Sequence, residues 1–462
     1  MRNRLCGPRA LRRVLAGLTG AALLAVAAPA PAADGAASQG LFNPTTFTLD
    51  NGLEVVVVEN RRAPIVTQML WYKVGSADEP HGKSGLAHVF EHMMFKGTEK
   101  HPGNAFSRIV ARHGGEQNAF TSDDYTGYYQ TVAREHLGLM MKLEADRMEN
   151  LRLGESDFLT ERRVVLQERY QRVTNDPQSR LQEMASATLY LHHPYGTPII
   201  GWENELKKLE LADLEGYYDR WYAPNNAVLV VAGDVTPKAV RKLAEKHYGD
   251  IEREEVPERQ RVTEPEQTAQ RRVALSSPQV SQPRLSIRYL APSYRTAEDE
   301  GMPYALQVLD EVLGGGPTSR LYRALVVEKD LAVSAGSWYS PTAYDRTSFG
   351  FYISPRGEVP IEKVEAALRA EIRDVLQNGV SERAVSDAIT RLRADAVYAR
   401  DSISSAPRII GRALTVGQTV EDVEAWTQRI RAVTPADVEA AAEQVLKETR
   451  SVTAVLTAEP AS

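Results

Sequence analysis

The sequence predicts an α+β fold built from two similar halves, each a mixed or antiparallel sheet packed with helices. Three observations lead to this prediction. About 430 residues remain after an N-terminal leader, which is more than one hydrophobic core usually supports. Stretches with strand and helix patterns alternate in both halves of the chain. A charged, proline-containing segment at 251–272 divides the chain almost in half and is typical of a solvated linker.

Residues 1–32 have the pattern of a signal peptide. Five arginines precede an apolar run at 14–28 that is too short to span a bilayer, and Ala30-Pro31-Ala32 offers a small-residue cleavage site. We therefore expect an exported protein, periplasmic or secreted. The predicted domain boundaries are 41–250 for an N-terminal domain and 273–462 for a C-terminal domain.

The composition after the leader excludes several classes of protein. Cleavage removes five of the 55 basic side chains, none of the 61 acidic ones and the only cysteine, which leaves a net charge of about −11. The acidic balance argues against a nucleic-acid partner, and the missing cysteine excludes disulfides and thiolate chemistry. No second apolar stretch reaches the roughly 18 residues of a membrane span, so we expect none in the mature chain.

Local patterns place the elements within each half. In the first half, 46–59 predicts a hairpin that turns at Asn51-Gly52, and 65–74 and 227–232 predict further strands. Helical patterns are found at 85–96, 104–113, 135–150 and 156–173. The second half has strand patterns at 284–290 and 451–457 and a helical pattern at 302–313. A duplicated fold fits this order, although no residue-level repeat is visible.

The segment 84–97 contains the strongest chemical motif. Ser84 is the expected N-cap and Gly97 the expected stop of a helix that carries His88, Glu91 and His92 on one face. Two imidazoles one turn apart suit a tetrahedral zinc ion, and the order His-x-x-Glu-His is the inverted-zincin signature, in which the glutamate is the base. The alternative is a pair of ordinary interior histidines.

A catalytic zinc needs a third protein ligand and an open position for water. Glu168 is the expected third ligand, 76 residues after His92 on the helix at 156–173. Glu161, two turns earlier on the same face, is expected to orient a ligand histidine from outside the coordination sphere. Taken alone, these glutamates on an arginine-rich helix would indicate a solvated, ion-paired surface.

The motifs around these residues resemble those of the pitrilysin, insulinase and mitochondrial-processing-peptidase family. They comprise the His-x-x-Glu-His helix, Asn118-Ala-Phe-Thr121, Tyr125-Thr-Gly-Tyr-Tyr129, the two glutamates, HPYGTPIIG at 193–201 and YAPNNAVLVVAGDV at 222–235. The resemblance covers nearly all of the mature chain. It implies a zinc endopeptidase with two homologous αβ halves that form half of a clamshell chamber, in which peptides or unfolded polypeptides are cleaved.

Carried over to this sequence, the resemblance implies one Zn²⁺ per chain on His88, His92 and Glu168, with Glu91 as general base for the attacking water. It also implies that Asn118 and Ala119 lie on an exposed strand edge, to which a substrate adds as a further strand. The alternative for Asn118 is a turn residue. His193 is expected to have a packing role.

The sequence departs from the family in the second half. Active members often supply an Arg and a Tyr, seven residues apart, from this half to hold the substrate. Here those positions fall on Val326 and Val333, while Arg320, Tyr322 and Arg323 lie out of register. We therefore expect a heterodimer in which a sister chain supplies the Arg and Tyr, with a homodimer as the alternative. The competing function is a non-catalytic subunit of an assembly.

Overall fold

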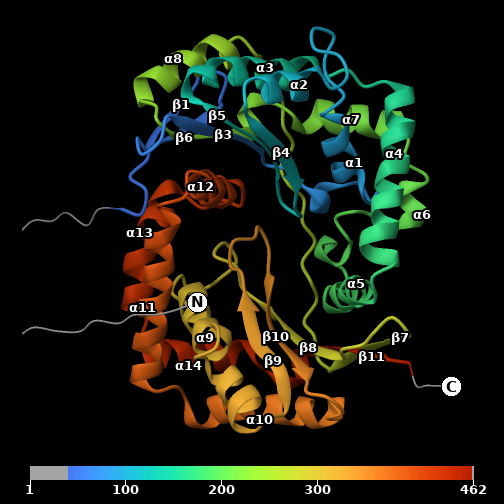
Figure 1. Ribbon diagram of the computed structural model, residues 1–462, viewed down its shortest axis with the longest axis vertical. Coiled ribbons are helices and arrows are strands. Elements are labelled where there is room, and N and C mark those ends of the chain that lie inside the picture. Colours follow the sequence, from blue (N-terminus) through green and yellow to red (C-terminus); the bar gives the residue numbers. More distant parts are fainter. Residues whose placement is uncertain (1–39, 460–462) are drawn as a thin grey trace, which may run out of the picture. The chain divides into compact units, whose positions relative to one another are not determined.

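A computed structural model of the chain describes residues 40–459. The predicted signal peptide lies outside the described residues. Two sheets dominate the described part, and helices cover both faces of the first sheet (Figure 1). This confirms the predicted α+β class with two sheets packed with helices. Within the described residues, no helix is long and apolar enough to cross a membrane.

The first sheet has the strand order β1-β2-β6-β3-β5-β4. Its strands are β1 (Thr45–Thr48), β2 (Glu54–Glu59), β3 (Ile65–Tyr72), β4 (Glu116–Thr121), β5 (Thr126–Ala133) and β6 (Ala227–Gly233). β1 and β2 form the predicted hairpin, and Gly52 takes the positive φ that its turn requires. β4 is an outer strand and pairs with β5 only.

The second sheet has the strand order β7-β11-β8-β10-β9. Its strands are β7 (Arg271–Ser277), β8 (Arg284–Ala291), β9 (Ala332–Tyr339), β10 (Thr347–Pro355) and β11 (Ser451–Ala458). The order and directions repeat those of the first sheet without β1. In each sheet the last strand in sequence pairs parallel to the first of the repeat and antiparallel to the second. The duplication is therefore one of topology, which explains why no sequence repeat is visible.

Helices connect the strands in both halves. The first half contains α1 (Leu86–Met93), α2 (Ala105–Arg112), α3 (Leu137–Asn150), α4 (Glu155–Arg169), α5 (Pro177–Leu189), α6 (Glu203–Leu206), α7 (Leu211–Trp221) and α8 (Pro237–Tyr248). The second contains α9 (Met302–Gly314), α10 (Ile361–Asn378), α11 (Glu382–Ala399), α12 (Ser405–Thr415), α13 (Val420–Ala432) and α14 (Pro435–Val445). By its place between the second and third strands of its half, α9 corresponds to α1, yet it contains no histidine.

Each half covers a face of the other half's sheet. α12 packs on β3 and β6 of the first sheet, and α5 packs on β7 and β11 of the second (Figure 1). The first sheet is consequently buried on both sides: Val55 and Val57 face one core, Val56 and Val58 the other. This two-sided burial explains the continuous apolar run of β2, where a one-sided sheet would show alternation.

The segment between α8 and β7 contains no helix or strand, and most of its residues are exposed as expected of a solvated linker, but a few of its side chains anchor it to the fold. Arg259 donates to the carbonyl oxygen of Lys73 at 3.1 Å and to that of Thr415 at 3.2 Å, so it bonds to both halves. Glu264 is buried and accepts hydrogen bonds from three consecutive backbone N–H groups, beginning with Leu191 at 2.7 Å. A charged composition does not reveal whether the charges find partners inside the fold.

Candidate active site

The helix α1 begins one residue later, and with a different cap, than the sequence suggested. Gly85 is the N-cap residue with φ of 87°, and the carboxylate of Glu79 accepts hydrogen bonds from Gly85 N at 3.0 Å and Ala87 N at 2.8 Å. The predicted N-cap Ser84 instead accepts a hydrogen bond from Trp202 N through its hydroxyl. Glu79 therefore caps the helix N-terminus by accepting hydrogen bonds from two of its backbone N–H groups. The last helical residue is Met93, short of the predicted end.

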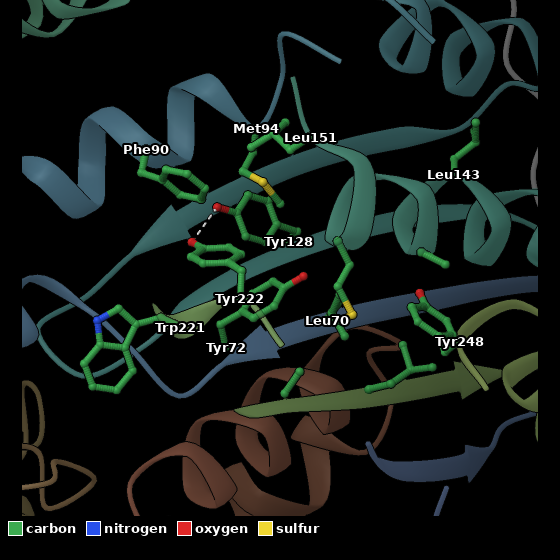
Figure 2. Packing of buried hydrophobic residues seen from close by; sticks show 14 of the residues in the cluster. Leu70, Tyr72, Phe90, Met94, Tyr128, Leu143, Leu151, Trp221, Tyr222 and Tyr248 are labelled. Carbon is green, nitrogen blue, oxygen red and sulfur yellow. Dashed lines mark hydrogen bonds between the residues drawn. The ribbon is translucent and has the colours of Figure 1, made fainter. Parts of the chain in front are cut away.

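The apolar side of α1 is held by an aromatic cluster above the first sheet. The Phe90 ring lies 4.5 Å from that of Tyr222, and the Tyr128 and Tyr222 hydroxyls are hydrogen-bonded at 3.1 Å (Figure 2). All helical residues of α1 are buried except His88, Glu91 and His92, which are half-buried. Burial of one side thus fixes the direction of the three polar side chains.

The structure brings the three predicted metal ligands together. α4 lies against α1, and Glu168 Oε2 is 3.5 Å from His92 Nε2 and 3.9 Å from His88 Nε2. The three ligand atoms lie within 4.8 Å of one another, and no other group of three His, Cys, Asp or Glu side chains in residues 40–459 is arranged to hold a metal ion. Two imidazole nitrogens and a carboxylate are a donor set that suits a zinc ion.

Glu161 takes the predicted position behind His92. Its Oε2 is 2.9 Å from His92 Nδ1, and its other oxygen pairs with Lys96. The hydrogen bond to His92 lowers the pKa of Glu161. Burial acts to lower the pKa of His92, but the hydrogen bond and charge of Glu161, together with the charges of Glu168 and Glu91, outweigh it, and the pKa is raised. Glu161 therefore leaves His92 Nε2 as the nitrogen turned toward Glu168. Sequence reasoning assigned no role to Lys96.

Burial controls the protonation of His88. It lowers the pKa of the imidazole to about 3, and the neighbouring His92 and Arg172 act in the same direction. His88 is therefore neutral around pH 7, as a metal-binding imidazole must be. Its buried Nδ1 has no hydrogen-bond partner among the described residues.

Glu91 is held by the neighbouring strand. Its Oε2 accepts a hydrogen bond from Thr121 Oγ1 at 2.6 Å, which ties α1 to the end of β4. Burial raises the pKa of Glu91, although the bond from Thr121 opposes the shift. A carboxylate with a raised pKa is a stronger base. The role of Thr121 was missed, although Thr121 belongs to the motif 118–121, because hydroxyl contacts leave no pattern in a sequence.

Arg172 contacts Glu168, and the sequence did not indicate this contact either. It lies in the π-helical turn that follows α4, and its guanidinium donates to Glu168 Oε1 at 2.5 Å. The carboxylate of Glu168 is thereby shared, with Oε1 on Arg172 and Oε2 toward the two histidines. Glu168 thus combines the ion pair expected of a charged helix surface with the position expected of a metal ligand.

Asn118 and Ala119 lie on β4, opposite Tyr129 and Tyr128 of β5. Since β4 is an outer strand, its other edge has no strand partner in the described sheet. Asn118 is exposed, and its side-chain oxygen accepts from Ala119 N. The turn alternative for Asn118 does not hold, because it lies within the strand.

The second half offers no polar replacement at the positions where the family has Arg and Tyr. Val326 is buried and Val333 is exposed on the outer strand β9. Arg320 is engaged by Glu371 at 3.2 Å and by Asp374, within its own half. His193, expected to be structural, is buried and pairs with Asp345 at 3.1 Å.

Comparison with protein families assigns both halves. The family described as "Insulinase (Peptidase family M16)" matches residues 54–203, and the "Peptidase M16 inactive domain" matches residues 208–392. Together they span well over half of the chain. The chain belongs to peptidase family M16. The first match includes both histidines and the glutamates at 91, 161 and 168, and the second runs from the start of α7 into α11 and includes α9.

Curated and solved M16 proteins resemble the whole chain. The zinc protease PqqE of Helicobacter pylori is 30% identical over 89% of this chain and 92% of its own length. The crystal structure of a Helicobacter pylori protease superposes with a TM-score of 0.84 at 28% identity, covering 90% of this chain and 99% of that one. The periplasmic protease PqqL of Escherichia coli shares the fold, with a TM-score of 0.76 at 21% identity. The match covers 89% of this chain but 47% of that protein.

Proposed function

We propose that the chain is a zinc-dependent endopeptidase that hydrolyses peptides or unfolded polypeptides. The observation that carries this proposal is the convergence of His88, His92 and Glu168 within 4.8 Å, with Glu91 on the same helix face. Membership of a peptidase family and relatives named zinc proteases support it. We also propose that the chain is organised as two domains, 41–250 and 273–462, joined by the segment 251–272.

The residues divide the work by their contacts. His88, His92 and Glu168 would hold the metal, and Glu161 orients His92 through Nδ1. Zinc, when bound, supplies Lewis acidity that activates water and polarises a peptide carbonyl. Glu91 accepts the proton of the attacking water and passes it to the leaving amine, since its buried carboxylate is a strengthened base. Thr121 keeps that carboxylate in place.

The outer strand β4 is the proposed substrate edge, with Asn118 and Ala119 at its centre. Its register with β5 leaves backbone groups on the far side for an extended peptide. Because Thr121 on this strand bonds to Glu91, a peptide on β4 would lie beside the proposed base. Main-chain pairing of this kind gives affinity with little dependence on the substrate sequence.

A homologous partner chain is the proposed source of the missing Arg and Tyr. Val326 and Val333 offer no polar group, and Arg320 is committed to ion pairs. The periplasmic protease that shares this fold is about twice as long as the part this chain covers, so two chains of this size would match it. The second candidate function is that of a subunit without catalytic activity of its own. It is supported by the same absence of polar side chains at Val326 and Val333. We also propose export to the periplasm, from the leader at 1–32.

The proposal is tested with the mature chain, zinc analysis and a quenched fluorescent peptide. We expect about one zinc per chain, and Glu168→Gln should lose both zinc and cleavage. Glu155→Gln is the matched control, because Glu155 is exposed on the same helix. Zinc binding that survives Glu168→Gln would contradict the ligand assignment. Cleavage that rises only when a homologous chain is added would support the heterodimer, and full activity of the chain alone would contradict it.

A further inference from the structure

A cavity of about 410 Å³ lies between α5 and the face of the second sheet that α5 covers. Its lining comes from α5, β8, β9, β10 and β11 and includes Arg284, Arg288, Trp338 and Tyr352. None of the lining residues belongs to the candidate metal centre. The volume is within the range of small-molecule and peptide side-chain sites.

Strand alternation gives this cavity its charge. On β8, Leu285, Ile287 and Tyr289 face the hydrophobic core, whereas Arg284, Ser286 and Arg288 belong to the opposite face, and all three line the cavity. In the first sheet the equivalent strand β3 places Met69 and Trp71 on the matching face, where α12 covers them with apolar side chains. The position that is apolar and filled in one half is therefore cationic and hollow in the other.

Two glycines allow aromatic rings to lie flat on the sheet. A Cβ at Gly350 would be 2.1 Å from the Trp338 ring, and one at Gly336 would be 2.6 Å from the Tyr352 hydroxyl. The two rings are nearly parallel, at 27°, with centroids 6.4 Å apart. Arg288 lies 5.7 Å from the centre of the Trp338 ring, and Arg284 lies 5.9 Å from that of Tyr352. The cavity thus has an aromatic wall with a guanidinium beside each ring.

The charge of Arg288 has no counter-ion. The residue is 5% exposed, and its one hydrogen bond runs from a terminal nitrogen to Ser186 Oγ at 3.1 Å. Its buried Nε has no acceptor, and within residues 40–459 no carboxylate pairs with Arg284 or Arg288. Buried charges are normally paired, because desolvation without a partner is costly. An anion in the cavity would supply the missing acceptor.

We propose that this cavity, the carboxylate pocket, binds a carboxylate-bearing residue of a peptide. The buried, unpaired Arg288 donates to the carboxylate, and Arg284 adds positive charge to the same cavity. The Trp338 and Tyr352 rings contact the apolar part of the residue. The chain is acidic overall, so this pair of unpaired cations stands out as an anion site. Because peptides are the substrates, the inference rests on the proposed function. The carboxylate has two possible sources, the C-terminus and an acidic side chain.

Binding is measured by calorimetry with the mature chain carrying Glu91→Gln, which slows cleavage enough for binding to be followed. Three versions of one peptide are compared: the free acid, the C-terminal amide, and an amide with an added glutamate. We expect the free acid to bind about tenfold more tightly than the plain amide, as one charge-assisted contact implies. Tight binding of the glutamate amide as well would mean that the pocket accepts either source. Equal affinity for all three peptides would overturn the proposal.

Arg288→Gln should abolish the preference for the carboxylate while leaving the affinity of the plain amide unchanged. Since Arg288 is buried and its variant can fail to fold, the half-buried Arg284→Gln and Trp338→Leu provide second tests, with Arg323→Gln as control on an exposed arginine elsewhere. Arg284→Gln should weaken the carboxylate preference, whereas Trp338→Leu should weaken the binding of all three peptides. An unchanged preference in folded Arg284→Gln, together with unchanged affinities in folded Trp338→Leu, would contradict the pocket. Cleavage by the wild-type chain is measured separately, so loss of the carboxylate preference and loss of peptidase activity are distinguishable.

Discussion

Glu161 determines which nitrogen of His92 is free for a metal. Its carboxylate bonds to Nδ1 at 2.9 Å, so Nε2 is turned toward Glu168. We predict that Glu161→Gln lowers zinc affinity by about 10- to 100-fold, as loss of such a supporting partner does elsewhere. Competition with a chromogenic chelator measures this. Glu155→Gln on the same helix should leave the affinity unchanged, and an unchanged affinity in Glu161→Gln would contradict the role.

His88 makes the metal-free protein sensitive to acid. Its pKa of about 3 in the fold is below the unfolded value of 6.5, so unfolding takes up a proton. The stability due to neutral His88 is therefore full above pH 6.5 and is lost as the pH falls toward 3. We predict that metal-free wild type loses about 2 kcal/mol more than metal-free His88→Leu between pH 7.5 and 5. Urea unfolding at both pH values tests this, and parallel losses would contradict it.

The helix α3 supports α1 through a buried ion pair that the sequence did not reveal. Glu144 and Arg147 are almost wholly buried, and Arg147 also reaches the carbonyl of Met94 at the end of α1. We predict that Glu144→Ala destabilises the protein by about 3 to 5 kcal/mol, because Arg147 is left buried and unpaired. Thermal unfolding measures this, with Glu149→Ala on the exposed side of α3 as control. A loss equal to that of the control would contradict the role of the pair.

At the level of elements, the sequence predicted most of the first half and the three residues that converge on a metal. Helical spacing brought His88 and His92 to one face, and the second helix placed Glu168 and Glu161 seven residues apart. What it could not predict were contacts between distant segments: Glu79 capping α1 in place of Ser84, Thr121 holding Glu91, and Arg259 bridging the halves. These contacts depend on three-dimensional proximity, which local patterns do not encode.

At the scale of the molecule, the reciprocal covering by α5 and α12 makes the halves dependent on each other. Residues 41–250 alone would expose Met69, Trp71 and Val230, which α12 and α13 cover in the whole chain. We predict that this fragment binds a hydrophobic dye and aggregates, and that co-expression with 251–462 restores a soluble protein. Size-exclusion chromatography and dye fluorescence measure this. A monomeric, dye-free fragment with normal zinc content would contradict the dependence.

The most direct test of the central claim is a comparison of zinc content and peptide cleavage between the wild-type chain, with any partner that it requires, and Glu91→Gln. Glu91 lies on the same helix face as the histidines but is not one of the three grouped ligands, and its carboxylate accepts a hydrogen bond from Thr121. The account predicts that Glu91→Gln retains one zinc per chain and loses kcat by about 10²- to 10⁴-fold, as removal of a general base does. Loss of zinc from Glu91→Gln, or cleavage at the wild-type rate, would contradict it.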